Sequence, residues 1–436
     1  MKYLIIVFTS LTLLLSAACQ VVSEAPEPKE IEESGTFLSS GLQREMEPNV
    51  GENQVEQLAI DNTTFALAFY ELIREYDENL IFSPFSLSLA LSMTLAGAET
   101  STQQAMLEAL QFSMDEGEIH PTFNALLLAI EASQAIDDTD LSEGGNFQLN
   151  IANSIWGQDG FEFKEPFLDT LAVNYGAGLN IVDYMSDPES ARLAINEWVE
   201  AETEEKIQDL IPPNAITPLT RLVLANAIYF NGSWMYPFDL NATAPGTFYL
   251  LDGSEISAEM MKLFGENLLY AKDNDFQAVR LPYLSSDFAM TLIVPDAGAF
   301  ESVQGALSTS FINDISDMMR SELINLEMPK FDFETEINAN EVLKSLGMEE
   351  AFDPDVSDFK GIADVDDLHI TDVLQKATIT VDEEGTEAAA ATAVIVGVES
   401  MPMDEPISLV VDRPFFFLIQ HIPTGTILFM GHIVQP

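Results

Sequence analysis

The sequence is poor in basic residues. Only 17 Lys and Arg stand against 72 Asp and Glu in a chain of 436 residues, which gives a formal net charge of −55. Charged residues make up only 20% of the chain, so basic residues are depleted rather than acidic ones unusually abundant. Such a chain repels nucleic acid and acidic membrane surfaces, and it favours cationic partners. Adaptation to a saline habitat and ordinary acidic drift in a secreted protein account for this composition equally well.

The sequence also lacks the motifs of the common enzyme classes. It has no GxSxG motif, no HExxH motif and no Gly-rich phosphate loop after a strand. We therefore expect no enzymatic activity, no cofactor and no metal. We interpret the four histidines as structural or surface residues: His120, His369, His421 and His432.

Cysteine is nearly absent, and the one cysteine lies at the end of an export signal predicted over residues 1–18. Lys2 precedes an apolar run from Tyr3 to Leu15, which has signal-peptide length and is short for a permanent membrane span. The following Ser16-Ala17-Ala18-Cys19 resembles a bacterial lipoprotein box, which implies lipidation at Cys19 and an anchored location in the cell envelope or at the extracellular face. An ordinary signal peptide cleaved near Ala18 is the alternative. With one cysteine, no internal disulfide can form.

Residues 19–57 are predicted to form a lipidated flexible tether, because they are rich in Glu, Pro, Ser and Gly and contain few large apolar residues. From Leu58 to Pro436 no linker or repeat divides the chain, so we expect one domain. Helices are predicted mainly early and strands mainly late, which indicates an α+β fold. The predicted helices cover 58–74, 83–93, 100–110, 191–211 and 338–346, and the clearest predicted strands cover 150–156, 222–229, 288–294, 376–381, 415–419 and 426–433.

The segment from Glu383 to Ala393 carries the functional signal. Its alanine run favours a helix by propensity alone. It follows the strand Ala377 to Val381, however, and leads into the β-prone residues Val394 to Val398. If the segment became a strand, every second side chain would face inward, and those side chains are small and uncharged: Thr386, Ala388, Ala390 and Thr392.

This stretch resembles the hinge of the inhibitory serpins, whose reactive loop begins with acidic residues, a Gly, a Thr and alanines. The segments 79–86, 224–234, 412–418 and 425–431 resemble serpin segments in the family's order. The similarity covers Leu58 to Pro436. It implies three β-sheets, about eight or nine helices and an exposed reactive loop over about 383–411. It also implies a suicide substrate: a serine protease cuts the loop and forms an acyl-enzyme, and the loop then inserts into a sheet and traps the protease.

The resemblance also assigns site residues. The hinge comprises Glu383, Glu384, Gly385, Thr386, Glu387, Ala388, Ala389, Ala390, Ala391 and Thr392, with Gly385 predicted to supply backbone freedom. The reactive bond is placed between Glu399 and Ser400. A polar cluster where the sheet opens is assigned to Ser83, Ser86, Asn226, Trp234 and Gln375. Gln375 stands where a histidine is usual in the family, which predicts an altered threshold for opening.

The loop predicts the class of protease. Glu399 indicates a Glu-accepting serine protease, and Val398 leaves an elastase-like protease as the second candidate. A trypsin-like target is disfavoured, because no Lys or Arg lies between Thr378 and Asp412. None lies between Arg74 and Lys164 either, which argues against activation by heparin-type polysaccharides. We expect a monomer that does not bind nucleic acid.

A non-inhibitory serpin-like binding or carrier protein on the cell surface is the alternative function. Such relatives usually carry bulky, charged or proline residues in the hinge. The inward-facing positions of this hinge hold none of these.

Overall fold

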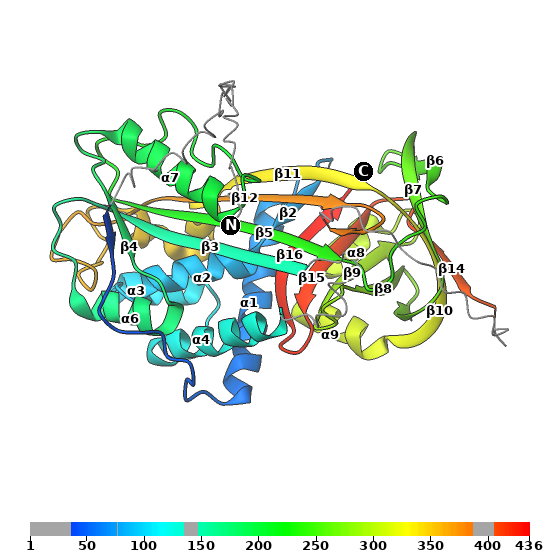
Figure 1. The fold of residues 1–436 in the computed structure, drawn as a ribbon, viewed down its shortest axis with the longest axis horizontal. Coiled ribbons are helices and arrows are strands. Elements are labelled where there is room, and N and C mark those ends of the chain that lie inside the picture. Colours follow the sequence, from blue (N-terminus) through cyan, green and yellow to red (C-terminus); the bar gives the residue numbers. More distant parts are fainter. Residues whose placement is uncertain (1–35, 76, 135–146, 387–404) are drawn as a thin grey trace, which may run out of the picture. The chain divides into compact units, whose positions relative to one another are not determined.

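The structure is a computed structural model, and it describes residues 36–75, 77–134, 147–386 and 405–436. Helices precede most of the strands along the chain, and sheet and helices form separate layers (Figure 1). This confirms the predicted α+β class. The described residues form nine α-helices: α1 (Glu52–Ile73), α2 (Pro84–Leu95), α3 (Thr100–Ala109), α4 (Glu116–Ser133), α6 (Glu165–Tyr175), α7 (Pro188–Glu202), α8 (Phe300–Ala306), α9 (Thr309–Met318) and α10 (Asn340–Leu343).

One sheet has seven strands and carries the predicted site. Its spatial order is β1 (Thr36–Leu38), β4 (Leu179–Val182), β3 (Phe147–Gln158), β5 (Leu222–Ser233), β13 (Gly385–Thr386), β12 (Ile370–Val381) and β11 (Phe331–Asn338). Helix α7 lies on one face, and α2, α4 and α6 lie on the other (Figure 1). The apolar side of α7 packs there on small residues of β5, including Ala225 and Ala227. The sheet is therefore buried on both faces, which explains the continuous apolar run in β5.

The second sheet joins nine strands in one hydrogen-bonded network. Its order is β14 (Ile407–Val410), β10 (Arg320–Pro329), β7 (Glu255–Lys272), β8 (Phe276–Pro282), β9 (Phe288–Pro295), β15 (Phe415–His421), β16 (Thr426–Ile433) and β2 (Leu80–Phe82), and β6 (Ala244–Tyr249) pairs with β7. Three separate sheets were predicted. The described strands form two networks because the long strand β7 pairs with β6 at its start, with β10 along its middle and with β8 at its end.

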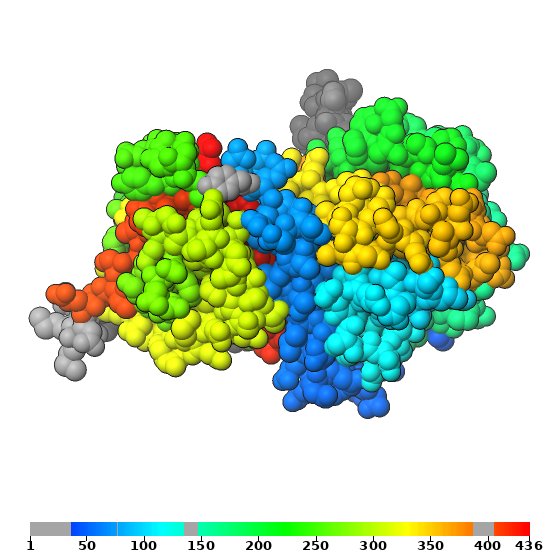
Figure 2. Space-filling view, turned by 180° about the vertical axis from the view of Figure 1, so that it is seen from behind, coloured from blue at the N-terminus to red at the C-terminus, as the bar shows by residue number. Residues whose placement is uncertain are grey.

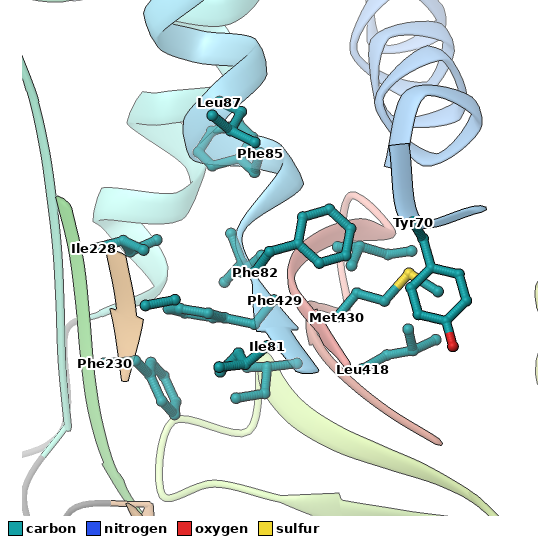
Figure 3. Close-up of a cluster of buried hydrophobic side chains, with 14 of the residues drawn as sticks. Tyr70, Ile81, Phe82, Phe85, Leu87, Ile228, Phe230, Leu418, Phe429 and Met430 are labelled. Atoms are coloured by element: carbon teal, nitrogen blue, oxygen red, sulfur yellow. The ribbon is translucent and has the colours of Figure 1, made fainter. Parts of the chain in front are cut away.

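Helix α2 is the centre of the core, since all of its residues are buried. Pro84 occupies its first turn, and the Ser83 side chain caps it by accepting a hydrogen bond from the Ser86 amide. Phe85 of this helix belongs to one buried cluster with side chains from both sheets, among them Ile228 of β5 and Phe429 of β16 (Figure 3). The core thus fixes β5 over the start of α2.

The folded part begins earlier than predicted. Residues 36–57 were assigned to a flexible tether, yet β1 pairs with β4 and α1 starts at Glu52. Arg44 lies between them and forms an ion pair with Glu131 at 2.6 Å. The Glu, Pro and Gly residues of this segment were interpreted as linker residues. Strand pairing at the sheet edge and the ion pair with α4 outweigh their low propensity for regular structure.

Two helices are less regular than predicted. The helix predicted over 191–211 ends at Glu202, because Glu204, Glu205 and Asp209 have left-handed backbone angles that interrupt a right-handed helix. The helix predicted over 338–346 is α-helical over Asn340–Leu343 and continues as a π-helix over Lys344–Met348, in which Gly347 has a left-handed backbone angle. Apolar spacing continues past both ends, so the periodicity alone did not reveal these breaks.

The opposite side of the domain is formed by α1, which runs beside the surface of residues 300–330, and by α3 beside the segment after α10 (Figure 2). Within the described residues, no helix combines the length and the apolar character that crossing a bilayer requires.

Candidate functional site in the seven-stranded sheet

The parallel pair β5 and β12 separates at one end, and the hinge enters between them. The two strands pair directly up to Ile228 and Ala377. Beyond that point Gly385 and Thr386 form β13, which pairs antiparallel with Ser233 and Gly232 of β5 and with Val381 of β12. The first two residues of an additional central strand are therefore already in the sheet. We call the line between β5 and β12 the seam.

Gly385 is required for a reason other than the predicted one. Its backbone is not in the left-handed region. A Cβ atom at Gly385 would instead collide with the Gly232 carbonyl oxygen and lie 2.8 Å from the Ser233 Cα. Glycine is needed because the backbones of β13 and β5 approach closely.

Thr386 faces inward, as predicted, and is only 2% exposed. Its hydroxyl lies 2.9 Å from the hydroxyl of Tyr283, whose ring stacks on Trp234 at a centroid distance of 4.7 Å. Burial raises the pKa of Tyr283 well above its ordinary value, so this phenol stays neutral. The Thr386 pocket is thus uncharged and closely packed.

Glu383 anchors the start of the hinge. Its carboxylate accepts hydrogen bonds from Lys330 Nζ and Thr243 Oγ1, both at 2.6 Å. Burial opposes the ionisation of Glu383, but Lys330 and Thr243 outweigh it and lower the pKa of this carboxyl. The carboxylate is therefore ionised at neutral pH.

Trp234 lies at the hinge rather than in the polar cluster to which it was assigned. Its backbone amide donates to the Glu384 carbonyl at 2.9 Å, and its indole nitrogen donates to the Asp382 carbonyl at 3.0 Å. The hinge backbone is thus held from both the sheet and the Trp234 ring. Three hinge contacts were not predicted from the sequence: Thr243, Tyr283 and Lys330.

The other four predicted residues meet beneath the middle of the seam. Gln375 of β12 accepts a hydrogen bond from the Ser83 amide at 3.0 Å and donates to the Ser83 carbonyl at 2.9 Å. It also donates to Asn226 Oδ1 of β5 at 2.6 Å. Asn226 Nδ2 donates in turn to Ser86 Oγ at 2.7 Å. A single side chain thus ties β12 both to β5 and to the start of α2.

Asn153 completes this cluster and was missed. It lies opposite Asn226 in the β3–β5 pair. Its side-chain oxygen accepts hydrogen bonds from Ser86 Oγ and Asn226, and its nitrogen donates to the Ser86 carbonyl at 3.2 Å. An asparagine inside the buried strand predicted over 150–156 was the available signal, because a buried amide needs partners. We call Ser83, Ser86, Asn153, Asn226 and Gln375 the seam cluster.

Several predicted residues lie outside the described part of the chain. They are Cys19, the hinge residues Glu387, Ala388, Ala389, Ala390, Ala391 and Thr392, and the proposed reactive bond between Glu399 and Ser400.

The family model described as Serpin (serine protease inhibitor) matches residues 61–436. The chain belongs to the serpin family. It is 38% identical over 379 residues to an uncharacterized serpin-like protein of Thermococcus kodakarensis, a match that covers 87% of this chain and 85% of the relative. It is 35% identical to the leukocyte elastase inhibitor of Sus scrofa, covering 88% of this chain and all of the relative. Human antithrombin-III is 31% identical, covering 95% of this chain and 88% of the relative.

A solved serpin has the same fold. The native-state structure of Tengpin, a thermophilic serpin, superposes with a TM-score of 0.79 at 26% identity, covering 92% of this chain and all of Tengpin. Like the family description, the names of the pig and human relatives denote inhibitors rather than enzymes.

The seam cluster consists of neutral groups alone. Every side chain of the seam cluster is a hydroxyl or an amide, and Gln375 fills the position predicted to hold a histidine in relatives. Gln375 is 1% exposed and uses both its oxygen and its nitrogen in hydrogen bonds. Because the Gln375 amide does not titrate, protonation of this residue cannot open the seam cluster.

Proposed function

We propose that this serpin inhibits serine endopeptidases as a suicide substrate. A protease cuts the reactive loop and forms an acyl-enzyme, and the freed loop then enters the seam as a complete strand that carries the protease along. The observation that supports this most directly is β13, a two-residue strand of the hinge that already separates β5 from β12.

The register of β13 predicts where the rest of the loop would lie. Thr386 pairs with Gly232 of β5 and with Val381 of β12. Continued by six residues in the same register, the strand places Thr392 between Asn226 and Gln375. These are the two residues that hydrogen-bond across the closed seam.

This placement supplies a replacement for a bond that insertion must break. An added strand moves β5 and β12 apart by about 4.8 Å, which is too far for Gln375 to reach Asn226. Gln375 would keep its bonds to Ser83, but Asn226 Oδ1 would lose the bond from Gln375, and a buried acceptor without a partner costs about 1–3 kcal/mol. The hydroxyl of Thr392, which both donates and accepts, offers both amides a new partner.

The length and energy of insertion fit the proposal. The 14 residues from Thr386 to Glu399 span roughly 46 Å as a strand. A central strand gains one or two ladder hydrogen bonds per residue, so insertion is worth on the order of 10–20 kcal/mol. That free energy is available only after the loop has been cut.

We infer a Glu-accepting serine protease as the target and the bond between Glu399 and Ser400 as the site of cleavage. An elastase-like protease that cuts after Val398 is the second candidate. We further propose that the mature protein is lipidated at Cys19 and anchored in the cell envelope or at the extracellular face.

A gel assay with a panel of proteases tests the proposal. The protein is incubated with Glu-preferring, elastase-like and trypsin-like serine proteases and then run under denaturing conditions. We expect a covalent band at the summed mass with the first or second protease, and a released peptide that begins near Ser400. Clean cleavage by the whole panel, without such a band, would favour the non-inhibitory binding or carrier function.

A further inference from the structure

A hollow of about 380 Å³ lies between helix α9 and the turn that joins β7 to β8. Phe311, Asp314 and Met318 line it from α9, because their spacing of three and four residues places them on one stripe of the helix. The side chains that α9 buries belong to a different stripe, which contains Ile312 and Ile315. The hollow is therefore formed by the flank of α9 and leaves its packing on the sheet intact.

The apolar part of the lining is aromatic. Phe276 at the start of β8 is only 3% exposed, and the ring of Phe311 lies against it with a centroid distance of 5.1 Å. Met318 is 37% exposed and adds a polarizable thioether to the lining. The face of an aromatic ring attracts a cation that lies within about 6 Å of its centre. This lining therefore suits a cation that also carries apolar groups.

The charged part of the lining is acidic. Asp273, Asp314 and Asp317 line the hollow, and none of these carboxylates forms an ion pair within the described part of the chain. The basic residue of the lining, Arg320, donates instead to the backbone carbonyls of Asp317 and Met319 at 2.7 and 2.6 Å, at the C-terminal end of α9. Three carboxylates and one guanidinium give the lining an excess of negative charge, which favours a cation.

The chemistry of the lining favours an organic cation over a metal ion. Within residues 36–75, 77–134, 147–386 and 405–436, no group of three or more His, Cys, Asp and Glu side chains is close enough to hold a metal. A hard metal ion takes oxygen ligands in exchange for its water, and neither an aromatic ring nor a thioether supplies them. Aromatic rings do recognise quaternary ammonium groups, whose positive charge is spread over apolar methyl groups.

We propose that this hollow binds a small organic cation with a quaternary ammonium group. Phe276 and Phe311 contact its methyl groups, and Asp314 and Asp317 balance its charge. None of the lining residues belongs to the hinge or to the seam cluster. The binding site is therefore independent of the proposed inhibitory function, and a failure of either leaves the other untouched.

Binding is tested on the full chain by ligand-observed NMR titration with choline chloride as the probe. The titration is run at about 0.15 M sodium chloride, which screens the unspecific attraction of cations to the acidic surface. Ammonium chloride serves as the competitor, because the ammonium ion has the same charge and no methyl groups. We expect ammonium to displace choline only at a concentration roughly tenfold higher or more, since it buries no apolar surface.

Matched variants separate the ring from the charges. Phe311→Leu keeps an apolar side chain and removes the ring, and we expect it to bind choline about threefold more weakly. Asp314→Asn combined with Asp317→Asn should weaken binding roughly fivefold or more, because two exposed carboxylates are neutralised. Glu56→Gln combined with Glu202→Gln removes the same charge from exposed positions of α1 and α7 and should leave binding unchanged.

Two results would overturn the proposal. Equal binding of choline by the wild type and by both site variants would show that the hollow does not hold it. Displacement of choline by an equal concentration of ammonium would show that the acidic surface attracts any monovalent cation, without a contribution from the aromatic rings.

Discussion

Single side chains decide whether the hinge can enter the sheet, and Thr386 is the first of them. It is small, uncharged and fully enclosed beside Tyr283 and Trp234. A charge in this position would have to be buried without a partner, which costs several kcal/mol.

Thr386→Arg should therefore turn the inhibitor into a substrate. Insertion would slow, hydrolysis of the acyl-enzyme would win, and the loop would be cut without a trapped protease. The fraction of protease recovered in a covalent complex measures this. Thr386→Ser keeps the hydroxyl and should trap normally, and a Thr386→Arg variant that traps stoichiometrically would contradict the proposed insertion.

Glu383 should make the closed hinge sensitive to acid. Its pKa in the folded protein is lowered, chiefly by Lys330 and against the effect of burial, so its stabilising contribution is present above its ordinary value of about 4.3. That contribution is lost as the pH falls through the lower, folded-state pKa. Glu383→Gln should cost about 2 kcal/mol of stability at pH 7, because a buried ion pair loses one partner while Lys330 remains partly in solvent.

Denaturant unfolding at several pH values measures this difference. The gap between wild type and Glu383→Gln should shrink below pH 4. A gap that stays constant from pH 7 to pH 3 would show that the charge of Glu383 does not stabilise the hinge.

At the scale of elements, the inserted strand must match the seam in register. The structure supplies that register from only two hinge residues, since β13 is paired on both sides. Continued in this register, the strand places Thr392, six residues further along the loop, between Asn226 and Gln375.

Thr392→Val should impair trapping more than Thr392→Ser, because valine cannot bond to the separated Asn226 and Gln375. We expect the cost of one buried acceptor without a partner, the side-chain oxygen of Asn226, to appear as a cleaved form that is less stable by about 1–3 kcal/mol. Guanidinium unfolding of the loop-cleaved variants measures it. Equal stability of the valine and serine variants would contradict the register.

Elements were easier to predict from the sequence than the site. The terminal strands and β5 were recognised because continuous apolar runs signal buried strands. Gln375 and Asn226 were assigned to one cluster only through the serpin resemblance. Asn153, Thr243 and Lys330 were missed because their partners lie on distant parts of the chain, and no local pattern reports such contacts. Trp234 was misassigned because it follows the end of β5, eight residues after Asn226, and its partners Asp382 and Glu384 lie far along the chain.

Across the whole molecule, two buried histidines should couple stability to pH. Burial lowers the pKa of His421 and of His432 to about 4. Their ordinary value is about 6.5, so the unfolded chain binds two more protons than the folded one between pH 6.5 and pH 4. Stability should therefore fall with decreasing pH in this window, by about 1.4 kcal/mol per pH unit for each histidine.

Urea unfolding between pH 7 and pH 4.5 tests this slope. This pH range lies above the one, below pH 4, in which the contribution of Glu383 is lost. His421→Gln should halve the histidine part of the slope. A stability that is flat from pH 6.5 to pH 4.5 would contradict the burial of neutral imidazoles.

The central claim is that the cut loop becomes a strand between β5 and β12, and the thermal unfolding midpoint of the loop-cleaved protein tests it most directly. The loop is cut by a protease that is not trapped, and the cleaved and intact proteins are compared at equal concentration. Gaining 10–20 kcal/mol over about 400 residues predicts a midpoint raised by roughly 12–24 °C. An unchanged or lower midpoint after complete cleavage would contradict insertion, and with it the proposed mechanism of inhibition.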